Sequence, residues 1–181
     1  MNRKEALNLL KKHLPQENLI KHSLAVESCM AALAEKFQQD RESWALAGLL
    51  HDLDYEYTRE QPEKHGLVTG EFLQPLGLGE PIIHAIKAHN HQVEAESLMD
   101  FALYAVDPTT GFIIACALMH PSKKLENVNL KRMKKRFKEK NFARGADRDQ
   151  MRSCSRLDME LDEFLMTCLA AMQDIHRLLG L

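Results

Sequence analysis

The chain has 181 residues, of which 45% are hydrophobic and 28% are charged, and its formal net charge is −2. This length and composition predict one globular domain, residues 1–181, with a core large enough to need no covalent staples. The near-neutral charge excludes bulk electrostatic attraction as a reason to bind nucleic acid or an anionic membrane, so we expect neither as a partner.

The apolar runs of the sequence are short. GLL before His51 and GFIIACALM after Asp107 both fall well below the ~20 residues of a membrane span. The first residues, MNRKEALNLLKKH, are charged and amphipathic and lack the apolar core of a secretory signal. We therefore expect a cytoplasmic protein without membrane contact.

The cysteines stand far apart among apolar neighbours and form no CxxC motif or other common zinc-finger spacing. Disulfides are rare in the cytoplasm, so we expect reduced thiols that pack in the core. The residues concerned are Cys29, Cys116, Cys154 and Cys168.

Apolar residues recur in steps of three and four along most of the chain, which is the spacing of helices that each bury one face. No stretch alternates in steps of two with β-branched residues, so we expect an all-α fold, a single helical bundle. A C-terminal helical subregion is expected over about 122–181, and its polar part, 122–156, is expected at the periphery. The predicted helices, in chain order, are one that enters at Glu17 and carries a stripe from Leu24 to Phe37, one from Trp44 to Leu50, one from Val68 to Leu73, one from Pro81 to Ile86, one from Leu98 to Val106, a further apolar helix after Gly111, and a long helix from about Asp158 to Leu179.

Pro108 is expected to interrupt this helical pattern. Proline lacks the N–H that a helix interior requires, and it disfavours helical geometry in the residue before it. We therefore expect Asp107 to lie at a helix end or at a kink.

Histidines and aspartates punctuate the apolar segments, and burying an unpaired charge is costly. A shared metal ion is one partner that would satisfy all of them. Neighbours on a helix point about 100° apart, so adjacent ligands can meet one ion only near a helix end or where helices converge. A histidine–carboxylate set without thiolate argues against a structural zinc–cysteine site and suits Fe, Mn, Zn, Co or Ni. The candidate ligands are His22, His51, Asp52, His65, His89 and Asp107.

The order of these residues, H…HD…H…H…D, resembles the HD-domain superfamily of metal-dependent phosphohydrolases over about residues 20–115. The phrases GLLHDLDYE and LYAVDPTTG resemble bacterial members of the HDIG type. The His-Asp dipeptide alone is common by chance. A His-Asp dipeptide that follows an apolar helix, with a histidine upstream and an aspartate further along the chain, is a more specific signal. The resemblance implies an all-α bundle in which ligands converge from several helices, in agreement with the apolar periodicity.

The resemblance also implies a role for each ligand. The core metal site of the family corresponds to His22, His51, Asp52 and Asp107. The extra histidines of members that hold two metals, such as the bacterial diadenosine tetraphosphate hydrolases, correspond to His65 and His89. In such a site Asp52 would bridge the ions, so we expect one or two divalent transition-metal ions.

The sequence departs from the HDIG pattern after the dipeptide. The family often continues with Gly-Lys, whose lysine can touch phosphate, whereas these positions are Asp54 and Tyr55 here. We expect Lys64 or Lys87 to take over the phosphate contact. We expect Asp52 at the centre of the chemistry and Asp54 as an acid that assists proton transfer.

A divalent ion lowers the pKa of a bound water and polarises a phosphoryl oxygen. The resemblance therefore implies a phosphohydrolase that acts on a nucleotide or another small phosphate ester, as a monomer or a homodimer. The alternative is a non-catalytic HD module that binds a nucleotide or a protein partner for signalling. The complete ligand order favours the enzyme, since degenerate modules usually lose the dipeptide or the distal aspartate.

Other polar features leave alternatives open. His84 falls on a different helix face from His89, which favours a structural role, whereas His91 could replace the second histidine of a paired motif. The basic segment Lys131–Lys140 is interpreted as a solvated helix face, with binding of an anionic substrate or an RNA as the alternative. A row of arginines forms either an exposed, salt-bridged stripe or part of a phosphate pocket. Its members are Arg144, Arg148, Arg152 and Arg156.

Overall fold

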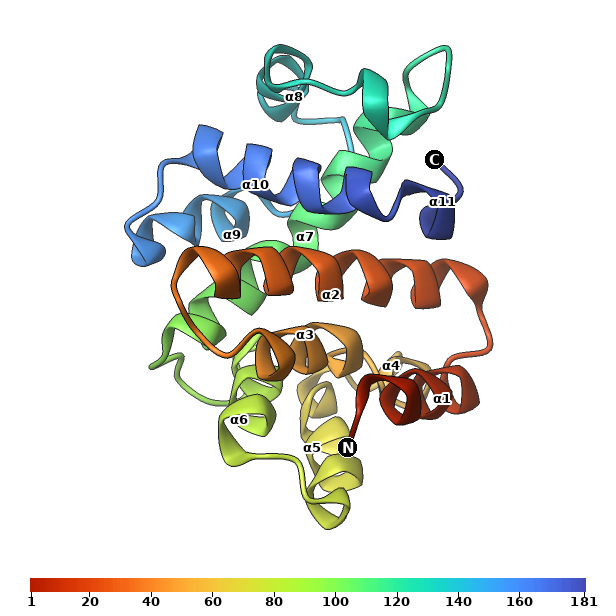
Figure 1. Ribbon diagram of the computed structural model, residues 1–181, viewed down its shortest axis with the longest axis vertical. Coiled ribbons are helices and arrows are strands. Elements are labelled where there is room, and N and C mark those ends of the chain that lie inside the picture. Colours follow the sequence, from red (N-terminus) through yellow and green to blue (C-terminus); the bar gives the residue numbers. More distant parts are fainter.

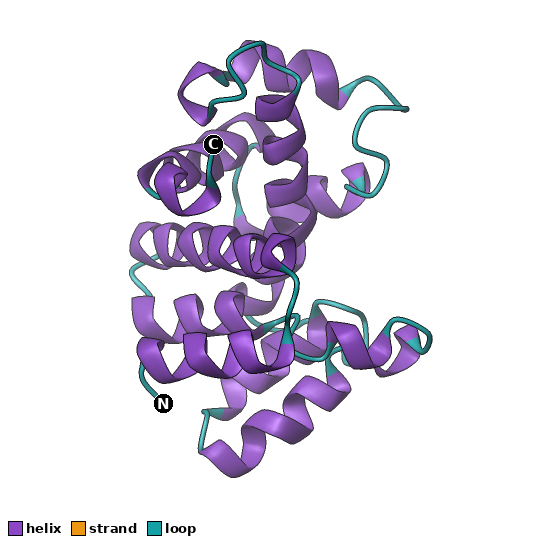
Figure 2. Cartoon of the chain, turned by 90° about the vertical axis from the view of Figure 1, so that its right-hand side faces the viewer, coloured by secondary structure: helices purple, strands orange, loops and turns teal.

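The computed structural model describes all residues, 1–181, and every regular element in it is helical (Figures 1 and 2). The all-α fold expected from the sequence is therefore confirmed. The α-helices are α1 (Arg3–His13), α2 (Glu17–Lys36), α3 (Arg41–Leu50), α4 (Tyr55–Thr58), α5 (Leu67–Leu73), α6 (Glu80–Ala88), α7 (Leu98–Leu118), α8 (Leu130–Phe137), α9 (Arg148–Arg152), α10 (Leu161–Asp174) and α11 (His176–Leu179). The short 3-10 turns are η1 (Pro62–Lys64), η2 (Gln74–Leu76), η3 (Leu125–Asn127) and η4 (Ser153–Leu157).

The long helix α2 lies at the centre of the bundle. It packs against α3 on one side and α10 on the other, and α7 crosses behind it in Figure 1. α6 contacts both α3 and α7, so four helices meet around one region of the interior. Figure 2 shows the same helices stacked in layers, with α5 and α6 at one end and α8 at the other.

The close contact between α2 and α3 depends on Gly48. A Cβ atom at this buried position would lie 2.9 Å from the carbonyl oxygen of Val26, closer than real Cβ atoms approach backbone. Glycine therefore lets the two helices approach closely at this point. The approach matters for function, because α2 carries His22 and α3 leads directly into His51.

The core is a single connected cluster that draws on helices from both ends of the chain. A single core agrees with the expectation of one domain over residues 1–181. The four cysteines belong to this cluster, and all of them are buried and unpaired, as expected from their apolar surroundings. They act as small apolar side chains that fill the interior.

α7 is continuous from Leu98 to Leu118, so of the two positions expected for Asp107, a helix end or a kink, the helix end is wrong. Pro108 lies inside the helix and has no N–H to donate to the carbonyl of Tyr104. The side-chain amide of Gln150, from α9, donates to this carbonyl at 2.9 Å instead. Because a second helix satisfies the freed carbonyl, Asp107 keeps a helical position beside α2.

By length and composition, α7 is the one helix in the structure that could cross a membrane. Its most apolar 18-residue window is 56% buried inside the bundle, as is usual for the core helix of a globular domain. In the sequence, Pro108 divides this helix into the shorter apolar runs on either side of it.

The long helix predicted over about 158–179 is divided in the structure. α10 begins at Leu161, and a break at Ile175 separates it from α11. Asp158 has a φ of 52°, in the left-handed region, and it ends the preceding turn η4. A residue in that conformation cannot begin a right-handed helix, so α10 starts three residues later than predicted.

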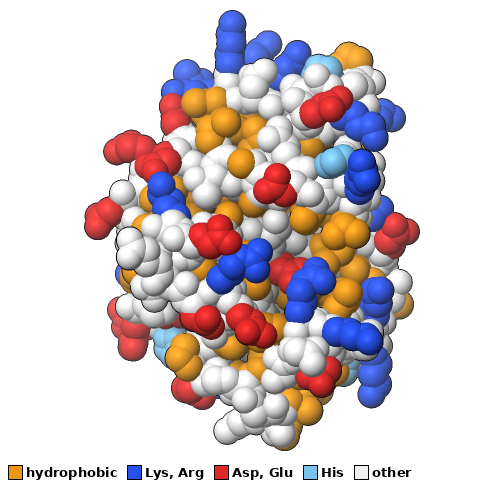
Figure 3. All heavy atoms as spheres, viewed as in Figure 1, with side chains coloured by type: hydrophobic (Ala, Val, Ile, Leu, Met, Phe, Trp, Pro, Cys, Tyr) orange, Lys and Arg blue, Asp and Glu red, His pale blue; other side chains and the backbone are white.

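α8 divides into an apolar and a basic face, as its sequence predicts. Met133 and Phe137 are buried, while the lysines of the opposite face are exposed and gather near the top of the molecule in Figure 3. The charge run is thus a solvated helix face. Its exposed lysines are Lys131, Lys134, Lys135 and Lys138.

Structural contacts account for most of the arginine row. The guanidinium of Arg148 lies 4.7 Å from the centroid of the Phe112 ring and donates to the backbone carbonyls of Phe142, Ala143 and Ala146. Arg152 forms an ion pair with Asp149 at 2.6 Å. These contacts favour the salt-bridged stripe over the phosphate pocket.

We expect Gly48→Ala to lower the free energy of unfolding by about 1–3 kcal/mol, because the added methyl group meets the α2 backbone. Gly111→Ala is the matched control, since this helical glycine has nothing within 4 Å of its Cβ position. The control should raise stability by up to about 1 kcal/mol through helix propensity. Chemical denaturation measures both; equal effects would show that the α2–α3 spacing does not depend on Gly48.

Candidate metal centre

Six side chains that lie far apart in the sequence meet where α2, α3, α6 and α7 come together. They are His22 on α2, His51 and Asp52 directly after α3, His65 directly after η1, His89 directly after α6, and Asp107 on α7. The side chains of His51 and His89 are 0% and 2% exposed and form a buried floor. Those of His22 and Asp107 are 21% and 29% exposed and form part of an open rim.

The first half of the cluster is built around His22. Its Nε2 atom lies 3.1 Å from Oδ1 of Asp107, 3.2 Å from Nε2 of His51 and 3.5 Å from Oδ2 of Asp52. The donor atoms of His22, His51 and Asp107 are close enough together to hold one metal ion.

The second half is built around the other oxygen of the same aspartate. Oδ1 of Asp52 lies 3.2 Å from Nε2 of His65, 3.4 Å from Nε2 of His51 and 3.9 Å from Nε2 of His89. The donor atoms of His51, Asp52 and His89 form a second group that could hold a metal ion. Oδ2 of Asp52 therefore faces His22 and Oδ1 faces His65, while His51 is common to both halves of the cluster.

Each imidazole is fixed from behind through Nδ1. His51 donates to the carbonyl of Gly48 at 2.8 Å, and His89 donates to that of Ile86. The hydroxyl of Thr110 donates to the carbonyl of Asp107, so it accepts from Nδ1 of His22 at 3.1 Å. Such bonds set the tautomer and leave Nε2 with its lone pair toward the centre.

This arrangement fits a bound cation. Two Nε2–Nε2 distances are 3.2 Å, one between His22 and His51 and one between His65 and His89. When both rings donate through Nδ1, their Nε2 lone pairs face each other and repel, unless a proton or a metal ion lies between them. Facing imidazoles beside two carboxylates are the donor set that divalent transition metals prefer.

Asp54 lies behind the cluster. Its carboxylate is fully buried and accepts from Nδ1 of His65 at 2.7 Å and from the backbone N–H groups of Gly66 and Thr69 at 2.8 and 2.9 Å. Three donors thus surround the carboxylate on the side of His65 that faces away from Asp52. This position suits the orientation of His65, and proton transfer by Asp54 stays a prediction.

Two cavities open beside the rim. One, of about 350 Å³, is bounded by His22, Asp107 and small residues of α7 and of the loop 143–146. The other, of about 320 Å³, lies beside His65 and includes Tyr55, Arg59 and Asn90. The cavities share no residue, and each adjoins a different half of the ligand set.

Comparison with known proteins identifies the family. The model of the HD domain matches residues 19–150. The chain belongs to the HD-domain family. The resemblance drawn from the order of the histidines and aspartates is thereby confirmed, and HD domains hold divalent metals at such clusters.

Similar curated proteins are named ribonuclease Y. Those of Fusobacterium nucleatum and Nitratidesulfovibrio vulgaris are each 30% identical over 95 residues, and that of Rubrobacter xylanophilus is 26% identical over the same length. The match covers 52% of this chain and 18–19% of each relative, so the chain spans about a fifth of their length. No solved structure matches.

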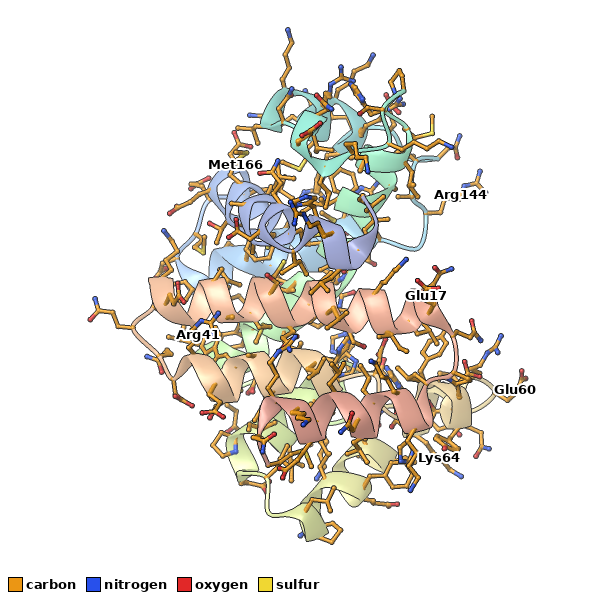
Figure 4. The ribbon with its side chains drawn as sticks, turned by 45° about the vertical axis from the view of Figure 1, so that its right-hand side comes forward. Glu17, Arg41, Glu60, Lys64, Arg144 and Met166 are labelled. Carbon is orange, nitrogen blue, oxygen red and sulfur yellow. The ribbon has the colours of Figure 1, made fainter.

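The expected phosphate-binding lysines lie outside both cavities of this HD domain. Lys64 is exposed at the end of η1 (Figure 4), and the side chain of Lys87 lies against Gly70 on α5. Neither lysine lines a cavity beside the metal centre, whereas Arg59 does. Substrate binding by these two lysines stays a prediction, as does the ligand role of each residue in the cluster.

The remaining histidines of interest have structural contacts. His84 bonds the buried carboxylate of Asp100 at 3.0 Å and so joins α6 to the start of α7. The ring of His91 meets the edge of Tyr104 at a centroid distance of 4.9 Å. Neither histidine belongs to the HD cluster, so His91 does not replace a missing ligand.

Sequence analysis missed the groups that orient the rings. Thr110 follows Asp107 by three residues, which places both on one helix face, and this spacing was the available signal. Nothing in the sequence could indicate that the carbonyls of Gly48 and Ile86 orient histidine rings, because every residue has a backbone carbonyl.

In the absence of a metal ion, the carboxylates hold protons on two of the imidazoles. Burial lowers the pKa of His51, but Asp52 and Asp107 outweigh it and raise this pKa to about 9. Burial also opposes protonation of His65, whose bonds to Asp52 and Asp54 raise its pKa to about 10. At neutral pH these protons lie where the HD site would hold its metal.

We expect the apparent affinity for Mn²⁺ to rise with pH. A metal binds neutral imidazole and must displace protons from His51 and His65, whose pKa values of about 9 and 10 lie above pH 7. The apparent Kd should fall by about 10-fold per pH unit for each displaced proton between pH 7 and 8. Competition with a fluorescent chelator measures it; a Kd independent of pH contradicts the expectation.

We expect Asp54→Asn to weaken metal binding by about 10- to 100-fold, because His65 loses the carboxylate that orients it. Asp100→Asn is the matched control, since Asp100 is equally buried and accepts from His84 and from backbone N–H groups. Both variants should lose stability, but only Asp54→Asn should lose metal by elemental analysis. Equal metal content in the two would refute an orienting role for Asp54.

Proposed function

We propose that this HD domain is a metal-dependent phosphohydrolase that acts on a nucleotide or another small phosphate ester. The observation that carries the proposal is the position of Asp52, whose Oδ2 lies 3.5 Å from His22 and whose Oδ1 lies 3.2 Å from His65, while His51 belongs to both groups of donors. Membership of the HD-domain family supports hydrolysis as the reaction class. A cytoplasmic location and a monomeric or homodimeric state are proposed with it.

The ligand set suits one or two divalent ions. His22, His51 and Asp107 would hold one, and His65 and His89 would hold the other with Asp52 between them. Bound Fe, Mn, Zn, Co or Ni supplies Lewis acidity and lowers the pKa of a coordinated water.

The protein residues supply position and exclusion of water. The buried rings of His51 and His89 close the floor, so a phosphate can approach only from the rim. His22, Asp107 and His65 border that rim, with side chains 21%, 29% and 16% exposed. Fixed donors of this kind cost no reorganisation when charge develops on phosphorus oxygens.

RNA is a second candidate substrate, favoured by the similarity to proteins named ribonuclease Y. The shared region covers 95 residues, and the net charge of −2 supplies no general attraction for a polyanion. We therefore rank a small nucleotide substrate above a long RNA.

We expect Asp52→Asn to lower the rate of phosphate-ester hydrolysis by at least about 1,000-fold, because both halves of the site lose a shared negative ligand. His91→Ala is the control, since His91 lies outside the cluster, and it should stay within about 2-fold of the parent. The assay follows product release across mono-, di- and dinucleoside substrates with each metal. Thermal stabilisation by these nucleotides without turnover would favour the non-catalytic HD module.

A further inference from the structure

The metal centre is open at two edges, which is more than a phosphate monoester needs. The rim residues His22 and Asp107 border one cavity of about 350 Å³, and His65 borders the other, of about 320 Å³. Between them lies Asp52, whose Oδ2 faces His22 and whose Oδ1 faces His65. A phosphorus atom held above Asp52 would therefore have a cavity on each side.

The cavity beside His22 is a groove along α7. It extends from Asp107 to Ala115, two helical turns or about 12 Å at ~1.5 Å per residue. The other residues that line it have small side chains, and a Cβ at Gly111 or Gly145 would meet nothing within 4 Å. The neighbouring Arg144 points outward in Figure 4, so beyond His22 and Asp107 no charged side chain lines the groove. An uncharged ring system, such as an aryl or nucleoside group, fits these walls.

The cavity beside His65 is polar. Arg59, with a side chain that is 54% exposed and paired with Glu56 at 3.6 Å, lines it together with Glu60. The amide nitrogen of Asn90 donates to the carbonyl of Pro62 at 2.9 Å, so its oxygen is free to accept. Because an arginine and a glutamate both line it, this edge suits a neutral polar group such as a sugar hydroxyl.

We propose that the substrate is a phosphodiester that carries one organic group into each cavity, with a ring system in the α7 groove and a polar substituent beside His65. This proposal rests on the proposed function and selects the diester within it. In the reaction, water forms a new bond to phosphorus and one ester P–O bond breaks. The departing oxygen takes a proton from the water and leaves as an alcohol, and a phosphate monoester remains.

Two substitutions test the two cavities. Gly111→Trp fills the α7 groove, and Leu118→Trp is its control, because Leu118 is exposed on the same helix outside the groove. Arg59→Gln removes the charge beside His65, and Arg41→Gln is its control, since Arg41 is also exposed and paired, at 2.6 Å with Glu35, away from both cavities.

The experiment compares bis(p-nitrophenyl) phosphate and a 3′–5′ dinucleotide with p-nitrophenyl phosphate on the metal-loaded protein. We expect the parent to hydrolyse the diesters with at least 10-fold higher kcat/KM than the monoester. Gly111→Trp should lower kcat/KM for both diesters by at least 10-fold and that for the monoester by less than 3-fold. Arg59→Gln should lower kcat/KM for the dinucleotide by about 5-fold. If Gly111→Trp does not fold, the result for Arg59→Gln tests the diester assignment.

The outcomes separate the two proposals. Monoester hydrolysis as efficient as diester hydrolysis, or equal effects of the variants and their controls, overturns the diester assignment and leaves the phosphohydrolase intact. A parent protein that hydrolyses none of the esters with any metal overturns the phosphohydrolase as well.

Discussion

The candidate site depends on a positive charge that relieves the repulsion between imidazole lone pairs, which face each other in two pairs on either side of the Asp52 carboxylate. His22 and His51 face each other at 3.2 Å, as do His65 and His89. Such a cluster is stable in a folded interior only with protons or metal ions among its donor atoms. The charge of Asp52, shared between the two pairs, stabilises positive charge at this point, whether it is carried by protons or by divalent cations.

The scaffold holds this unfavourable arrangement from outside. Gly48 lets α3 approach α2 closely and also supplies the carbonyl that orients His51, so one residue sets both the helix spacing and a ring tautomer. Asp54 orients the ring of His65 through a fully buried carboxylate. Because these supports are rigid and hydrogen-bonded, binding of a metal needs little movement of the protein.

The features that could be predicted from the sequence are those that a local pattern of residues determines. Periodic apolar residues predicted the helices, and the adjacent His51 and Asp52 after an apolar helix predicted the centre of the cluster. Prediction failed where a distant contact decides: Pro108 stays inside α7 because Gln150 satisfies the carbonyl of Tyr104, a partner 46 residues away along the chain. The contacts of Asp54 could not be predicted for the same reason, since its partners come from a later segment of the chain.

The most direct test of the account is an anomalous-scattering map of crystals grown with Mn²⁺. The account predicts density within about 2.0–2.2 Å of Nε2 of His22 and His51, with Asp52 bound to the same ion or shared with a second one near His65 and His89. A map with no peak at this cluster, in a protein saturated with the metal, would contradict the claim that these six side chains form a metal centre.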